Sequence, residues 1–192
     1  MTKRPRRRSE RGLVLVEFAL AALVMLTLLF GAVEFGLGWQ DRLTVQTAAR
    51  AGVRVGSNLT TNSQADYNIL LAVKSAISDV GLANVDNVVI YKSSTADGAV
   101  PSVCVTPVVI SVAATCNAYT GAQLTSLAPG QFGCGIGSLD LLWCPTARQN
   151  LQALGLDYIG VWIRMTHQNL TGFFGKTIKI TDSAVMRLEP LT

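Results

Sequence analysis

The sequence predicts an α+β protein in which a long N-terminal helix, transmembrane and then amphipathic, precedes a second helix and a small antiparallel sheet of about three strands. Three observations predict this class: an apolar run near the N-terminus, the absence of proline between Pro5 and Pro101, and two late segments rich in β-branched residues. The 192 residues, 49% of them hydrophobic, have room for one membrane segment and one modest folded domain.

The apolar run from Leu13 to Val33 is long enough to cross a membrane. It contains 21 residues, and at about 1.5 Å per helical residue it matches a hydrocarbon layer roughly 30 Å thick. Glu17 lies inside this run, where an ionised side chain costs on the order of 2.5 to 3.5 kcal/mol on insertion scales. A carboxylate free in lipid is therefore unfavourable, and we expect Glu17 to have a partner.

The basic residues are concentrated before the apolar run. The net charge is +4, and six of the 16 Lys and Arg residues precede Gly12. By the positive-inside rule they place the N-terminus in the cytoplasm and the remainder outside. Binding of nucleic acid or lipid headgroups by "KRPRRR" is an alternative, but topology already accounts for the charges, and we expect no nucleic-acid partner. A secretory signal is a further alternative, although its small-residue site at Ala19–Ala21 would precede most of the apolar core instead of following it.

The helical pattern continues beyond the membrane segment. Residues 38–56 keep their apolar side chains near one face, and Arg50 and Arg54 fall mostly elsewhere, as on a solvated face. After a polar linker, apolar residues at spacings of three and four predict a second helix that stops at Gly81. The expected organisation is a leader at 1–12, a transmembrane helix at 13–37, its amphipathic extension at 38–56 and an extracytoplasmic α+β domain at 57–192.

Three segments have the composition of β-strands: residues 84–94, 156–169 and 176–189. The last two flank "LTGFFG", which favours an antiparallel pair. Between the first and second strands lies a stretch of roughly 50 residues that is long for a structureless loop in a compact domain. We therefore expect covalent cross-links to hold it.

All four cysteines lie in this stretch, at Cys104, Cys116, Cys134 and Cys144. An even number of cysteines in an exported domain favours disulfides, and three full pairings are possible. We expect Cys104 with Cys116 and Cys134 with Cys144, because each pair closes a short loop between turn-forming residues. Zinc binding is the alternative, but the short CxxC spacing of a zinc knuckle is missing and the only histidine, His167, is remote in sequence.

The motifs of common enzymes are missing from the sequence. It has no HExxH, GxSxG or Walker loop, and "GCGIG" has Ser138 where a dinucleotide fingerprint needs its third glycine. His167 falls in or at the end of a predicted strand without a nucleophile motif to serve. Asp140, Asp157 and Asp182 are scattered singly, as caps, turn residues or surface residues are. We expect no enzyme, cofactor or metal site.

The N-terminal region resembles the class III signal of type IV pilin-like proteins, in which a basic leader ends in glycine and a glutamate stands five residues later. More specifically, "RGLVLVEFAL", "FGAVEFG" and "AARAGVR" resemble the N-terminal region of TadE-like proteins of the Tad (Flp) pilus system, and "SAVMRLEP" resembles the C-terminus of many such pseudopilins. The resemblance implies a pilin-like fold with a long N-terminal helix.

This resemblance implies roles for individual residues. A membrane prepilin peptidase would cut after Gly12, leaving Leu13 as a new N-terminus whose amine can pair with Glu17 of a neighbouring subunit. Glu17 and Phe18 would then set assembly and register. The proline that many family members carry beyond this Glu-Phe pair is replaced by Ala21 and Ala22, so no kink is expected. Leu13 in place of the phenylalanine usual in major pilins leaves N-methylation open.

The leading hypothesis is therefore a minor pilin or pseudopilin anchored in the bacterial cytoplasmic membrane, with its C-terminal domain outside and with possible incorporation in the surface pilus. Its expected partners are other pilin subunits, Tad assembly-platform proteins, the prepilin peptidase and the bilayer. An uncleaved single-pass protein that displays an extracytoplasmic binding domain is the alternative, and an exported hydrolase is the third hypothesis.

Overall fold

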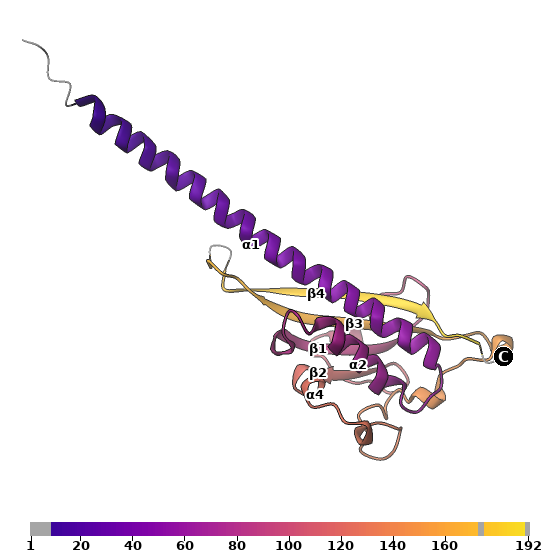
Figure 1. Cartoon of the computed structure of the whole chain (residues 1–192). Helices are drawn as coiled ribbons and strands as arrows, with labels where there is room; N and C mark the ends of the chain where they lie inside the picture. The colour runs from indigo at the N-terminus through magenta and orange to yellow at the C-terminus, as the bar shows by residue number, and fades with distance from the viewer. Residues whose placement is uncertain (1–8, 173–174, 191–192) are drawn as a thin grey trace, which may run out of the picture.

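The computed structural model describes residues 9–172 and 175–190. Its dominant element is α1 (Ser9–Leu59), an uninterrupted helix of 51 residues whose N-terminal half projects from the folded domain (Figure 1). The helix ends where Thr60 adopts a positive φ of 46° and its N–H donates to the Gly56 carbonyl at 3.2 Å. Such a left-handed residue is a common helix stop. Most of the basic leader lies outside the described residues.

Four antiparallel strands form one sheet in the order β2-β1-β3-β4. Their bounds are Val85–Ser93 (β1), Cys116–Thr120 (β2), Tyr158–Gln168 (β3) and Thr177–Arg187 (β4). The α+β class and the three expected strands are confirmed, but the number of strands was wrong. The missed strand, β2, has only five residues, and its sequence "CNAYT" lacks an extended run of β-branched side chains. It forms by pairing with β1, which local pattern does not reveal.

The main core lies between the sheet and two helices, α1 and α2 (Ala65–Ile77). Alternation along the strands separates the two faces of the sheet, so that Val88 and Ile90 enter this core whereas Val89 and Tyr91 enter a smaller cluster on the opposite face. The C-terminal half of α1 therefore belongs to the domain, while its N-terminal half does not (Figure 1).

Two glycines let α1 approach its neighbours closely. A Cβ atom on Gly52 would stand 2.8 Å from Val73 Cγ2, and one on Gly56 would stand 2.8 Å from Ile159 Cδ1. Ordinary van der Waals contact between carbon atoms needs about 3.5 to 4.0 Å. The absence of a side chain at these two positions thus allows the close approach of α1 to α2 and the sheet.

The long stretch between β1 and β3 is organised by short elements and cross-links. It contains α3 (Ser102–Val105), α4 (Gly121–Thr125) and short 3-10 turns, in addition to β2. Disulfides join Cys104 to Cys116 and Cys134 to Cys144, the pairing expected from the sequence. Within the same stretch, the buried Asp140 carboxylate accepts hydrogen bonds from the backbone N–H groups of Gly133 and Cys134. Asp140 is thus a structural loop residue.

Candidate assembly site on the N-terminal helix and its junction with the domain

The N-terminal part of α1 carries apolar side chains between Leu13 and Val33 that the domain does not cover. We call this segment the apolar sleeve. Leu13 is 72% exposed and Phe18 is 71% exposed, and the large apolar side chains from there to Val33 are 43% to 68% exposed. Among the residues that the structure describes, α1 is the one helix long and apolar enough to cross a membrane. Exposure of this kind over 21 residues, about 30 Å of helix, is stable only against lipid or other apolar surfaces.

The residues expected to govern processing and register lie together near the start of this sleeve. Gly12, Leu13, Glu17 and Phe18 occupy about two helical turns, and no other part of the described chain comes within 4 Å of a Cβ built on Gly12. Leu13 and Glu17 are four residues apart and share a face of α1. Glu17 is exposed and makes no hydrogen bond or ion pair with any described residue. Within the part of the chain that the structure describes, Glu17 therefore has no counter-charge.

The four cysteines lie apart from that site. Both disulfides lie in the stretch between β1 and β3: Cys104–Cys116 joins α3 to the start of β2 in the small second core, and Cys134–Cys144 lies nearer the surface. No cluster of three or more His, Cys, Asp or Glu side chains suited to a metal ion occurs in the described part of the chain. The cysteines thus stabilise the domain and do not contribute to the helix site.

Sequence reasoning missed the role of Glu34 at the end of the sleeve. This side chain is only 4% exposed, and its Oε2 accepts hydrogen bonds from the Thr171 N–H at 3.0 Å and from the Thr171 hydroxyl at 2.6 Å. Thr171 belongs to the turn between β3 and β4. The available signal was a carboxylate immediately after a 21-residue apolar run, but its partner lies 137 positions later in sequence. Contact with the domain thus begins inside the segment 13–37 assigned to the membrane helix.

A second contact between α1 and the same hairpin follows two turns later. His167 on β3 is buried, and its Nδ1 lies 2.7 Å from Asp41 Oδ2 on α1. The His167 ring packs against Gly38, where a Cβ would make ordinary contact at 3.8 Å. The structural role expected for His167 agrees with this geometry, because the ring holds the hairpin against the helix.

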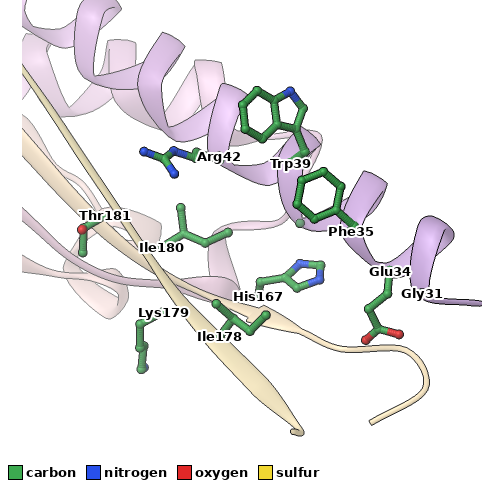
Figure 2. A pocket seen from close by; sticks show the side chains of 11 residues that line it. Gly31, Glu34, Phe35, Trp39, Arg42, His167, Ile178, Lys179, Ile180 and Thr181 are labelled. Carbon is green, nitrogen blue, oxygen red and sulfur yellow. The ribbon is translucent and has the colours of Figure 1, made fainter. Parts of the chain in front are cut away.

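A groove of about 580 Å³ runs along this junction. Figure 2 shows Phe35, Trp39 and Arg42 of α1 on one wall and Ile178 and Ile180 of β4 on the other. The Phe35 and Trp39 rings stack with their centroids 6.2 Å apart. The groove is mainly apolar, and the side chains of its walls contain no nucleophile with an adjacent general base.

Residues 12–54 match the family model described as TadE-like protein. The resemblance inferred from the sequence is thus confirmed over the apolar sleeve and most of the buried half of α1. No curated protein and no solved structure matches the chain. The family match and the apolar helix together fit a membrane-anchored component of a Tad pilus system.

Proposed function

We propose that this chain, TadE-like over residues 12–54, is a minor pilin or pseudopilin that takes part in assembly of a Tad-type pilus. The observation that carries the proposal is the projecting apolar helix with an unpaired carboxylate, Glu17, near its start. A helix with these properties needs both a bilayer and a counter-charge from another chain. A subunit that moves from membrane to filament meets both needs.

Topology follows from the charge of the leader. Six Lys and Arg residues before Gly12 favour a cytoplasmic N-terminus, which leaves the disulfide-bonded domain on the outer side of the cytoplasmic membrane. The proposed partners are other pilin subunits, the Tad assembly platform and a prepilin peptidase. The proposed role is structural and needs no cofactor.

Processing after Gly12 is supported by local physical chemistry. A peptidase needs an extended segment at the scissile bond, whereas Gly12 lies in the first turns of α1. Glycine is about 1 kcal/mol less favourable in a helix than alanine, so the first turns can unwind there at low cost. Cleavage would give Leu13 an amino group, which is positively charged near neutral pH and can pair with Glu17 of a neighbouring subunit. Such a buried pair selects alignment more than it adds stability.

Intact-mass analysis of the protein extracted from membranes tests this proposal. We expect a mature chain that begins at Leu13, and we expect Gly12→Val to retain the leader because a β-branched side chain obstructs the backbone at the cut. Gly31→Val is the matched control, since Gly31 is a helical glycine of the same sleeve that lies far from the cut. An intact N-terminus in the wild type, in cells that make the peptidase, would instead favour a single-pass protein displaying a binding domain.

A further inference from the structure

The turn between β3 and β4 lies at the level where the apolar sleeve of α1 ends. Thr171 in this turn binds Glu34, the residue directly after Val33, and the hairpin extends back along α1 toward its N-terminus (Figure 1). If α1 spans the bilayer through Leu13–Val33, as the proposed function requires, the segment around Leu170 and Thr171 meets the membrane surface.

Side chains at this level are sorted in an unusual way. The two carboxylates of α1 in the junction face the domain, where Glu34 bonds to Thr171 and Asp41 bonds to His167. Large apolar side chains remain outside. Four of them form what we call the junction belt. They are Phe35, which is 73% exposed, Trp39 (52%), Leu170 (73%) and Ile178 (44%). Water would favour the opposite arrangement, with acids exposed and apolar groups covered.

The spacing along α1 places Phe35 within the lipid headgroup region and Trp39 at its outer edge. Phe35 lies about 3 Å and Trp39 about 9 Å beyond Val33 along the helix axis, and the headgroup layer is roughly 5 to 8 Å thick on each side of the hydrocarbon core. Trp is enriched at this depth in membrane proteins.

We propose that the junction belt is a second membrane-contact surface, through which Leu170 after β3, Ile178 on β4 and the two aromatic residues of α1 rest on the lipid headgroups. The belt is continuous with the apolar sleeve, which is why we assign it to lipid and not to a second copy of the chain. The contact would fix the orientation of the domain relative to the bilayer, since a helix alone leaves it free to tilt.

Nitroxide labels at introduced cysteines test the proposal in the full-length protein. All four native cysteines are in disulfides, so a new thiol is the single labelling site. Leu170→Cys reports on the belt, and Ile136→Cys is the matched control, because Ile136 is an exposed aliphatic residue in a loop outside the junction. Val24→Cys reports on the middle of the sleeve. The measurement compares collisions with oxygen and with a polar nickel chelate in liposomes of phosphatidylethanolamine and phosphatidylglycerol.

We expect labels at residues 24 and 170 to collide more with oxygen than with the chelate, and the label at residue 136 to do the reverse. If the label at 24 lies in lipid but the label at 170 is as accessible to the chelate as the label at 136, the belt proposal is wrong and the membrane anchor is retained. A label at 24 in water would overturn the membrane-anchored function itself. Spin–spin broadening at 170 that is lost on dilution with unlabelled protein would assign the surface to a second copy, and so would also overturn the belt.

Tryptophan fluorescence provides a label-free measurement. Trp143 and Trp162 are buried in the domain, whereas Trp39 lies in the belt. Brominated lipids should quench wild-type fluorescence, and Trp39→Phe should remove the quenched fraction. Equal quenching of wild type and Trp39→Phe would contradict the proposal.

Discussion

Arg148 and Asp66 form an ion pair with both side chains fully buried, in which Nη2 lies 2.5 Å from Oδ1. The same carboxylate accepts hydrogen bonds from Asn117 at 2.8 Å and from the Tyr119 hydroxyl at 2.7 Å, and the guanidinium lies 4.2 Å from the centre of the Trp143 ring. One carboxylate therefore joins α2, β2 and, through Arg148, the segment that follows the Cys134–Cys144 disulfide.

Removal of Arg148 should strongly destabilise the domain. Arg148→Ala leaves the Asp66 charge buried without its cation, and loss of one partner of a buried pair lowers the free energy of unfolding by about 3 to 5 kcal/mol. Arg50→Ala, at an exposed arginine of α1, should change it by less than about 0.5 kcal/mol. Denaturant unfolding of the detergent-solubilised protein measures both, and equal stability of the two variants would disprove a structural role for the pair.

Alkaline pH should destabilise the domain through Tyr119. Burial, and then the adjacent Asp66 carboxylate, raises the pKa of Tyr119 well above its usual value of 10.0. Below about pH 10 the phenol is neutral in both states, so it leaves stability unchanged. At higher pH the unfolded chain loses the proton that the folded chain keeps, and the free energy of unfolding falls by about 1.4 kcal/mol per pH unit for this group.

The comparison with Tyr119→Phe isolates this effect. The variant is less stable at neutral pH because its hydrogen bond to Asp66 is lost, but its stability should fall less steeply above pH 10. Denaturant unfolding at a series of pH values gives both slopes. Parallel pH profiles would show that Tyr119 does not titrate differently in the folded and unfolded states.

Glu17→Ala should impair assembly without impairing membrane insertion. The substitution makes the apolar run continuous, which favours insertion, and it removes the only acidic side chain between Gly12 and Val33. Val24→Ala on the same sleeve is the control for a shortened side chain. Pilus counts and recovery of the protein in sheared filaments measure assembly, and normal values for Glu17→Ala would refute the counter-charge role.

The two disulfides should differ in their reactivity in the folded protein. Cys104 and Cys116 are fully buried, whereas Cys134 and Cys144 are partly exposed. A reductant should therefore open Cys134–Cys144 first, as followed by differential alkylation and peptide mapping. Replacing either pair by serine should lower the free energy of unfolding by roughly 3 kcal/mol, since the loops span 12 and 10 positions. Peptides linking Cys104 to Cys134 would contradict the pairing.

The sequence by itself determined the features that depend on local pattern. A 21-residue apolar run, the 3.6-residue periodicity after it and the absence of proline define α1, and β-branched residues on both sides of a short turn define β3 and β4. Short loops between cysteines made local disulfides the simplest pairing. Each of these signals can be read along a continuous segment of the chain, where periodicity and chain entropy act.

The tertiary structure decided the contacts between distant segments. Strand β2 exists because β1 offers it an edge, and Asp66 is tolerated in the core because Asn117, Tyr119 and Arg148 converge on it from later segments. Glu34 and Thr171 are 137 positions apart, so no local pattern pairs them. Burial of a polar group requires partners, and which partners arrive depends on how segments distant in sequence pack together: α1 against the hairpin for Glu34, and α2 against β2 for Asp66.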